Sequence, residues 1–274
     1  MTTARIDARF KTLKAEGRAA FVAYVMAGDP DEATALEILK GLPAAGADII
    51  ELGFPFSDPM AEGPPVQRAS LRALKSGATL NSTLALAAKF RETDQATPII
   101  LMGYLNPLLH HGLDAFAADA AKAGIDGAIV VDCPPEEAGP LTDALEANSL
   151  SLIRLTTPTT DDARLSSLIA RTSGFIYYVS VAGVTGVKEA DAAAVAPHVQ
   201  RMRMASGLPV AVGFGIKTPE RAAQVARVAD AVVVGSALVD EVAAGIERNE
   251  NVTQKVLSTA AALAKAVRSA RVGS

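Results

Sequence analysis

The chain has 274 residues, with 26 Lys or Arg against 30 Asp or Glu, so its formal net charge at pH 7 is −4. Half of the residues are hydrophobic and 20% are charged, which supplies enough apolar material for a large core and excludes a disordered chain. The sequence has no run of basic residues, so it lacks the electrostatic pattern of a nucleic-acid-binding protein. We therefore expect no nucleic-acid partner.

The cysteine count and the N-terminal segment bear on where the protein works. Cys133 is the single cysteine, so neither an internal disulfide nor a cysteine-based metal site is expected. Residues 1–17 mix charged and apolar residues at helical spacing, without the apolar centre of a signal peptide. No apolar run approaches the length of a membrane-spanning helix. We expect a cytoplasmic protein with an additional N-terminal helix and no membrane partner.

Eight short apolar runs recur along the chain: Ala20–Met26, Ala47–Leu52, Pro98–Met102, Gly127–Val131, Leu150–Leu155, Phe175–Val181, Leu208–Val212 and Ala231–Val234. Several are rich in Val and Ile without strict alternation, which is typical of strands buried on both faces of a parallel sheet. Segments with helical spacing lie between them: Glu32–Leu42, Leu113–Ala123, Pro135–Ala147, Asp161–Arg171 and Pro219–Val228. This alternation predicts a (β/α)8 TIM barrel, with a doubly wound open sheet as the alternative, because strand count alone does not prove closure.

Two further features complete the predicted fold. Gly46 and Gly124 each end a helical segment before a strand, where glycine favours a left-handed cap. The final segment, Val252–Val267, has its own apolar stripe and is expected to close the barrel. Residues 1–274 are thus predicted to form a single domain.

The connection after the second strand is longer than the others. About fifty residues separate the starts of the second and third strands, against about 20–35 elsewhere, an excess that is often functional. The connection contains Pro55–Pro65, which is too Pro-rich for a helix or an inner strand. It follows the carboxyl end of a strand, where barrels carry their active sites.

One acidic residue precedes this segment and another lies within it. Glu51 ends an apolar strand, where a carboxylate is costly unless it has a partner or faces a solvated mouth. It is either a structural carboxylate or a general acid/base with a raised pKa, and we favour the second. Glu62 lies eleven residues further on. Alone it reads as a solvated loop acid, but at one barrel mouth the two acids are plausible partners.

Glycines cluster after three of the later strands, in Gly183–Gly186, in Gly213–Gly215 and at Gly235. Exposed N–H groups near a helix start attract phosphate, and the loops after strands seven and eight commonly bind it in barrels. Ordinary turn glycines are the alternative for any one cluster. Neither a dinucleotide fingerprint nor a Walker A loop is present, and the three histidines lack metal-ligand spacing. No metal or redox cofactor is indicated.

The segment Ile50–Pro64, Ile-Glu-Leu-Gly-Phe-Pro-Phe-Ser-Asp-Pro-Met-Ala-Glu-Gly-Pro, closely resembles the signature of the tryptophan synthase alpha subunit family. Further motifs follow the family's order: Gly28-Asp29-Pro30, Asp132-Cys133-Pro134-Pro135-Glu136-Glu137, Gly183-Val184-Thr185-Gly186 and Gly213-Phe214-Gly215-Ile216. Together these motifs cover nearly the whole chain, and the first is long and specific.

The resemblance implies a (β/α)8 barrel that cleaves indole-3-glycerol phosphate to indole and glyceraldehyde 3-phosphate, in the last steps of L-tryptophan biosynthesis. The implied reaction is a retro-aldol cleavage, in which protonation of indole C3 makes the ring an electron sink. This chain then needs no cofactor. The family also implies a beta-subunit partner, which uses pyridoxal phosphate to join indole to serine, in an alpha2beta2 complex.

The resemblance also assigns roles to single residues. It makes Glu51 the catalytic acid/base and Glu62 the acid that binds the indole N–H, and Tyr177 matches an active-site tyrosine of the family. Residues that match substrate- or phosphate-binding and loop positions are Tyr24, Tyr104, Asp132, Thr185, Gly186, Gly215, Gly235 and Ser236. Tyr24 stands where the family often has Phe.

Glu62 departs from the family, which commonly has Asp at this position. The added methylene moves the carboxylate by about an ångström, and misplacement on that scale can cost on the order of a hundredfold in rate. Three alternatives therefore stay open on the sequence. They are a free-standing indole-glycerol phosphate lyase, a weakly catalytic barrel that mainly activates a beta subunit, and another phosphosugar barrel enzyme, which would not explain the long segment after Glu51.

Overall fold

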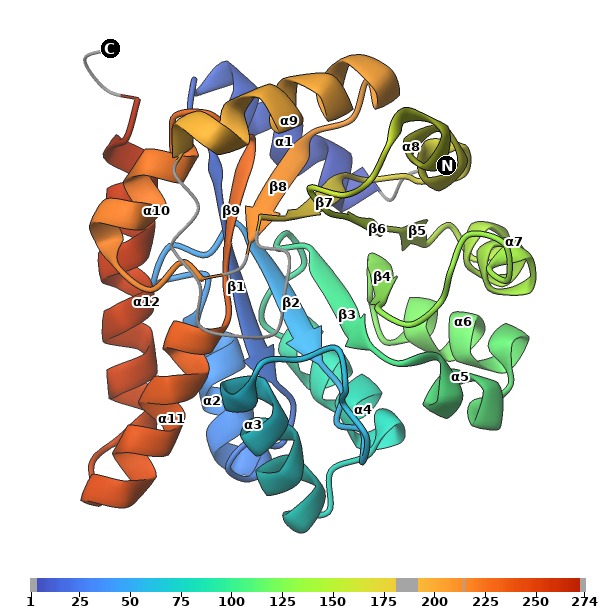
Figure 1. Ribbon diagram of the computed structural model, residues 1–274. Coiled ribbons are helices and arrows are strands. Elements are labelled where there is room, and N and C mark those ends of the chain that lie inside the picture. Colours follow the sequence, from blue (N-terminus) through green and yellow to red (C-terminus); the bar gives the residue numbers. More distant parts are fainter. Residues whose placement is uncertain (1–3, 181–191, 214, 272–274) are drawn as a thin grey trace.

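The computed structural model describes residues 4–180, 192–213 and 215–271, and its strands form one parallel sheet curled into a barrel (Figure 1). The strands are β1 (Ala20–Met26), β2 (Ile49–Gly53), β3 (Ile99–Gly103), β4 (Gly127–Val130), β5 (Ser151–Leu152), β6 (Arg154–Thr156), β7 (Ile176–Val179), β8 (Val210–Gly213) and β9 (Ala231–Val234). Their order in the sheet is β5-β4-β3-β2-β1-β9-β8-β7-β6. Each predicted run matches these strands to within two residues at either end.

The ring closes through β5 and β6, which are two parts of one barrel strand separated by Ile153. Gly127 of β4 pairs with Ser151 of β5, and Arg154 of β6 pairs with Ile176 of β7. The Ile153 N–H bridges the interruption by donating to the Ala128 carbonyl at 3.0 Å. The predicted eight-stranded barrel is thus confirmed, and the open sheet is not.

Helices surround the sheet (Figure 1). They are α1 (Ala4–Ala15), α2 (Glu32–Gly41), α3 (Pro64–Lys75), α4 (Leu80–Arg91), α5 (Leu105–His111), α6 (Leu113–Lys122), α7 (Gly139–Ala147), α8 (Asp162–Ile169), α9 (Ala192–Ser206), α10 (Pro219–Ala226), α11 (Ser236–Arg248) and α12 (Val252–Ser269). The last of them, α12, packs against α10, α11 and α2, as expected for a helix that completes the outer layer.

The additional N-terminal helix is confirmed, and it covers the N-terminal end of the barrel. Ile6 and Leu13 of α1 are fully buried among the apolar residues inside the barrel. Phe10 also faces inward, with its ring centroid 5.8 Å from that of Phe175. Figure 1 shows α1 at the opposite end of the barrel from α3, so α1 seals one end and leaves the other free for a site.

The long connection after β2 is confirmed, but one part of its prediction is wrong. Residues 54–63 form neither helix nor strand, whereas Pro64 and Pro65 open α3. Proline suits the first turn of a helix, because the N–H that it lacks would have no intrahelical partner there. The Pro-rich segment therefore ends in a helix start, two residues after Glu62.

The repeated helix-to-strand junctions have a common structure. Gly46 and Gly124 adopt φ values of 101° and 80°, which confirms the left-handed caps. An aspartate follows each glycine by two residues. Its carboxylate accepts a backbone N–H near the start of the preceding strand of the barrel. These bonds join Asp48 to Phe21 at 2.9 Å and Asp126 to Ile99 at 2.8 Å.

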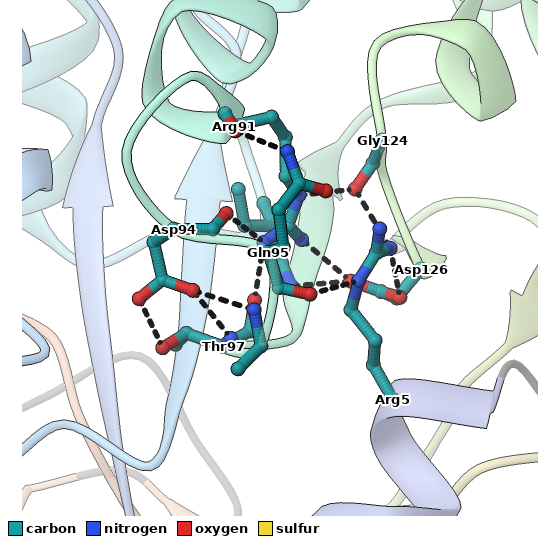
Figure 2. A network of polar contacts seen from close by, with 9 residues as sticks. Arg5, Arg91, Asp94, Gln95, Thr97, Gly124 and Asp126 are labelled. Carbon is teal, nitrogen blue, oxygen red and sulfur yellow. Dashed lines mark hydrogen bonds and ion pairs between the residues drawn. The ribbon is translucent and has the colours of Figure 1, made fainter.

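Asp126 also anchors a polar cluster at the N-terminal end of the barrel (Figure 2). Arg5 of α1 and Arg91 of α4 reach its two carboxylate oxygens at 3.0 and 2.8 Å. Arg91 additionally donates to the carbonyls of Gly124 and Thr97 at 2.9 and 2.7 Å. The cluster ties α1, α4 and the starts of β3 and β4 together.

Candidate active site

The strand register determines which side chains reach the C-terminal mouth of the barrel. Tyr24 of β1 pairs with Glu51 of β2, and both alternate with residues that point outward. Below them, the barrel interior is filled by apolar side chains: Ala20, Val22, Ile49, Ile100, Ile129, Ile153, Phe175, Ala211 and Ala231. Because this interior is packed, a ligand can enter only from the mouth.

A cavity of about 590 Å³, which includes its opening to solvent, occupies that mouth. It brings together seven of the residues singled out from the sequence: Tyr24, Glu51, Glu62, Tyr177, Gly215, Gly235 and Ser236. These residues come from five different parts of the chain, so their convergence depends on the barrel itself.

Glu51 is the most unusual group in the cavity. It is only 1% exposed, and its Oε1 has no hydrogen-bond partner. Burial, and secondly the charge of Glu62, raises the pKa of this carboxyl group to about 8. A carboxyl group with such a pKa holds a proton near neutral pH and can exchange it with a bound molecule.

Glu62 reaches the cavity from the end of the Pro-rich segment. Its backbone is fixed on both sides, since its N–H donates to the Pro59 carbonyl at 3.1 Å and its carbonyl accepts from Gln67 Nε2 at 2.9 Å. Burial raises the pKa of its carboxyl group to about 7. The two acids therefore share one cavity, with neither carboxyl group hydrogen-bonded to the described residues.

Glycines make room for the two tyrosines of the cavity. The Tyr24 ring lies across Gly53 and Gly235, and the Tyr177 ring lies over Gly213, where a Cβ atom would collide with the phenol. Burial, followed by the nearby glutamates, raises the pKa of both hydroxyls well above the usual value. Both groups consequently remain protonated donors.

Tyr104 differs from the sequence expectation, because it is not among the residues that line the cavity. Its hydroxyl accepts the Ala61 N–H at 2.9 Å, and its ring stacks on Phe56 with centroids 5.1 Å apart. Tyr104 therefore supports the segment that carries Glu62. Asp132 acts nearby as an anchor, since its carboxylate accepts the Leu105 N–H at 2.8 Å, at the start of α5.

The part of the cavity wall that follows β8 and β9 presents backbone groups. Gly235 is the N-cap of α11 and Ser236 its first residue, and no side chain caps this helix start. Gly215 has a φ of 75°, which favours glycine. A helix N-terminus with free N–H groups is suited to an anion such as phosphate. Thr185 and Gly186, the other predicted residues of this region, lie outside the described residues.

Sequence reasoning missed the apolar walls of the cavity. They are formed by Pro65, Val66, Met102, Ile216 and Val233. Met102 and Val233 follow the inward-facing Ile100 and Ala231 by two residues. The alternation of side chains along a strand therefore predicts that both face the barrel interior. The positions of Pro65 and Val66 depend on how the segment before α3 folds, and no local pattern indicates that.

The arrangement suits one kind of ligand. Apolar walls and aromatic rings accommodate a flat apolar group, the two acids can exchange protons with it, and the start of α11 can hold an anionic group. Within the described ranges, no group of three or more His, Cys, Asp or Glu residues could hold a metal ion. None of the helices in these ranges has the length and apolar character needed to cross a membrane.

Comparison with known proteins gives consistent results. Residues 10–268 match the family model described as "Tryptophan synthase alpha chain". The chain is 73% identical over 273 residues to the tryptophan synthase alpha chain of Caulobacter vibrioides (strain NA1000 / CB15N), which covers 100% of this chain and 99% of that relative. It is 74% identical over 271 residues to the corresponding chain of Phenylobacterium zucineum (strain HLK1), covering 99% and 98%.

A solved structure agrees in fold. The crystal structure of tryptophan synthase subunit alpha from Legionella pneumophila str. Paris superposes with a TM-score of 0.90 at 41% sequence identity. The match covers 97% of this chain and 98% of that one. The similarity in sequence and in fold thus extends over nearly the entire length.

Proposed function

The chain belongs to the tryptophan synthase alpha chain family, and from this premise we propose that Glu51 and Glu62 together perform the family's reaction. That reaction cleaves indole-3-glycerol phosphate to indole and glyceraldehyde 3-phosphate. The protein is accordingly a carbon–carbon lyase of tryptophan biosynthesis. The roles of its individual residues follow from the chemistry of the cavity.

One observation carries the assignment of the acid/base. Glu51 is a buried carboxyl group with an unpartnered oxygen in the cavity. Removing a carboxylate from water without a compensating bond destabilises the fold. A group kept under these conditions is suited to proton transfer, because its pKa of about 8 lies close to neutral pH.

Glu51 donates one proton and removes another during the cleavage. In its protonated form it donates to C3 of the indole ring, which turns the ring into an electron sink. As a carboxylate it then removes the proton of the glycerol hydroxyl beside the scissile bond. The carbon–carbon bond breaks, its electrons return to the ring, and Glu51 ends the cycle protonated as it began.

Glu62 stabilises the charge that develops in the ring. Protonation at C3 places positive charge on the indole nitrogen, and a carboxylate that accepts the indole N–H offsets that charge most strongly in the transition state. With a pKa of about 7, Glu62 ionises more readily than Glu51. The two acids are thus suited to different protonation states at the same pH.

The phosphate is assigned to the part of the wall that follows β8 and β9. Ser236 and the N–H groups at the start of α11 supply hydrogen-bond donors and the positive end of the helix dipole. Gly235 and Gly215 let the phosphate approach the backbone closely. From the family motif, Thr185 and Gly186 are proposed to complete this side of the site.

The family also implies the surroundings in which the protein works. We propose a beta-subunit partner in an alpha2beta2 complex, with pyridoxal phosphate bound by the beta subunit and no cofactor in this chain, in the cytoplasm. Met60, within the Pro-rich segment, and Leu109 of α5 are 81% and 57% exposed. Two large apolar side chains on connections that leave the C-terminal ends of β2 and β3 support partner binding at this end of the barrel.

The test measures both products from one substrate. The purified chain is incubated with indole-3-glycerol phosphate, alone and with an added beta subunit, and indole and glyceraldehyde 3-phosphate are quantified. We expect equimolar products from the wild-type chain, faster release with the beta subunit, and almost none from Glu51→Gln. Wild-type rates from Glu51→Gln would contradict the assignment.

A further inference from the structure

Tyr24 spans the cavity from the phosphate wall to the acids. Its ring contacts the backbone position of Gly235, with Cδ1 3.2 Å from where a Cβ would stand. Its hydroxyl lies over Gly53 of β2, two residues beyond Glu51 and on the same inward side. The phenol oxygen therefore lies beside the strand that carries Glu51, in the cavity that Glu62 also lines.

Three polar groups in this part of the cavity have no hydrogen-bond partner among the described residues. The Tyr24 hydroxyl and the Glu62 carboxyl group form no hydrogen bond with the described residues, and Glu51 Oε1 is buried without a partner. The buried Glu51 oxygen in particular is unfavourable unless a bound molecule or a neighbouring group satisfies it. Their arrangement is consequently completed only when the site is filled.

The protonation states determine which of the three donates. The pKa of the Tyr24 hydroxyl is raised well above its usual value by burial first, then by the charges of Glu62 and Glu51, and further by Asp29 and Tyr104. The hydroxyl therefore keeps its proton at neutral pH, and toward an ionised carboxylate it can only donate. Among the carboxyl groups facing it, Glu62 acts on it most strongly and has the lower pKa of the catalytic pair.

We propose that the Tyr24 hydroxyl donates a hydrogen bond to the Glu62 carboxylate in the substrate complex and so directs that carboxylate toward the indole N–H. This inference rests on the proposed role of Glu62. It makes Tyr24 a positioning residue that acts through Glu62, in addition to the contact of its ring with the ligand. Tyr177 has the complementary position, since the charge of Glu51 acts on it more strongly than that of Glu62.

A double-mutant cycle tests this coupling. We compare the wild type, Tyr24→Phe, Glu62→Asp and the double variant in indole-3-glycerol phosphate cleavage with saturating beta subunit. Tyr24→Phe removes one oxygen without changing the ring, and Glu62→Asp withdraws the carboxylate from the hydroxyl. We expect Tyr24→Phe to lower kcat about tenfold in the Glu62 background, with KM within about twofold, and to change kcat less than about twofold in the E62D background.

The pH profile provides a second readout, which a merely structural role would not change. A donated hydrogen bond favours the ionised carboxylate, so its loss raises the pKa of Glu62. The groups that face Glu62 are Glu51 from β2, Tyr24 from β1, Tyr177 from β7 and Tyr104 after β3. The acid limb of kcat, which reports the substrate complex, should therefore move to higher pH in Tyr24→Phe, and the double variant should show no shift relative to Glu62→Asp.

Tyr178→Phe is the matched control. Tyr178 lies in barrel strand β7, as Tyr24 lies in β1, but its side chain points out of the barrel. Its ring stacks on that of His198 with centroids 5.4 Å apart. Its variant should keep the wild-type kcat and pH profile. An equal loss on Tyr24→Phe in both backgrounds, or an unchanged acid limb, would overturn the proposed coupling.

A measurement without turnover separates this inference from the proposed function. In the Glu51→Gln chain saturated with substrate, the pKa of Glu62 is followed by 13C NMR of the labelled carboxyl group. We expect Tyr24→Phe to raise that pKa, whereas an unchanged value would contradict the hydrogen bond. Failure of the proposed function has a different signature, namely wild-type cleavage rates in Glu51→Gln or Glu62→Ala.

Discussion

Glu51 shows how one environment creates both a cost to stability and a chemical capacity. The residue stands in an apolar strand, and the surrounding packing removes water from its carboxyl group. The sequence alone indicated the direction of the pKa change, because an acid among Ile and Leu is desolvated wherever the strand lies. The sequence alone could not predict that Glu62 lies near Glu51, because the position of Glu62 depends on a segment without regular secondary structure.

The length of the Glu62 side chain gives the first prediction at this scale. Glu62→Asp should retain substantial lyase activity, because a carboxylate remains at the site and the segment that carries it can adjust. Glu62→Ala should lose most activity, by about a hundredfold or more, since no group then offsets the charge on the indole nitrogen. Steady-state indole formation checks both variants, and equal activity of Glu62→Ala and wild type would refute the role.

Gly213 gives a second prediction, which concerns space. A Cβ at this position would collide with the Tyr177 phenol, so Gly213→Ala should displace the tyrosine and lower kcat about tenfold or more. Gly139→Ala is the control, because a Cβ there meets open space. Activity assays alongside circular dichroism check the pair. Full activity in Gly213→Ala would show that the Tyr177 position is unimportant.

The elements of the barrel differ in how well their sequences predict them. The inner strands were predictable, because runs such as Ala231–Val234 are short, apolar and rich in Val. The first turn of α3 was not, since Pro64 and Pro65 suggest an irregular segment unless the helix start is known. The role of Tyr104 was equally hidden, because it depends on contact with a segment more than forty residues away.

The Asp126 cluster gives a prediction for the elements it joins. Asp126 is fully buried and meets both Arg5 and Arg91, so Asp126→Asn leaves buried positive charge without its partner. We expect a loss of about 3 kcal/mol in the free energy of unfolding, measured in urea. The cavity lies at the other end of the barrel, so kcat should change little at temperatures where the variant is folded.

The control for this variant is an exposed ion pair. Arg171→Ala removes contacts with Asp143 and Glu146 on the surface, and the urea midpoint should hardly move. A similar midpoint for Asp126→Asn and wild type would show that the cluster is not required for stability.

The whole molecule separates stability from chemistry along the barrel axis. Helix α1 and the aspartate clusters stabilise the N-terminal end, while the cavity and its acids lie at the C-terminal end. One continuous sheet and the packing of α12 against α10, α11 and α2 support our proposal that residues 1–274 form a single domain. The sequence indicated this layout through strand count and motif position, whereas ring closure at Ile153 required the structure.

Stability of the entire chain should depend on pH through Glu51. The pKa of Glu51 rises from 4.5 in the unfolded chain to about 8 in the fold, so between these values the unfolded state has released a proton that the folded state retains. Stability therefore declines as pH rises through this window, by at most about 1.4 kcal/mol per pH unit. Glu51→Gln should make that decline shallower and leave the part due to Glu62, whose carboxyl pKa burial raises to about 7. Parallel slopes for the two chains between pH 5 and 8 would contradict the burial of the charge.

We propose that one cavity binds the substrate while Glu51 carries out its cleavage. Calorimetric titration of the Glu51→Gln chain with indole-3-glycerol phosphate tests both parts of this proposal. We expect saturable binding at one site per chain, with indole formation slowed about a thousandfold relative to wild type. Absence of binding would contradict the assignment of the cavity, and undiminished indole formation would contradict the assignment of Glu51.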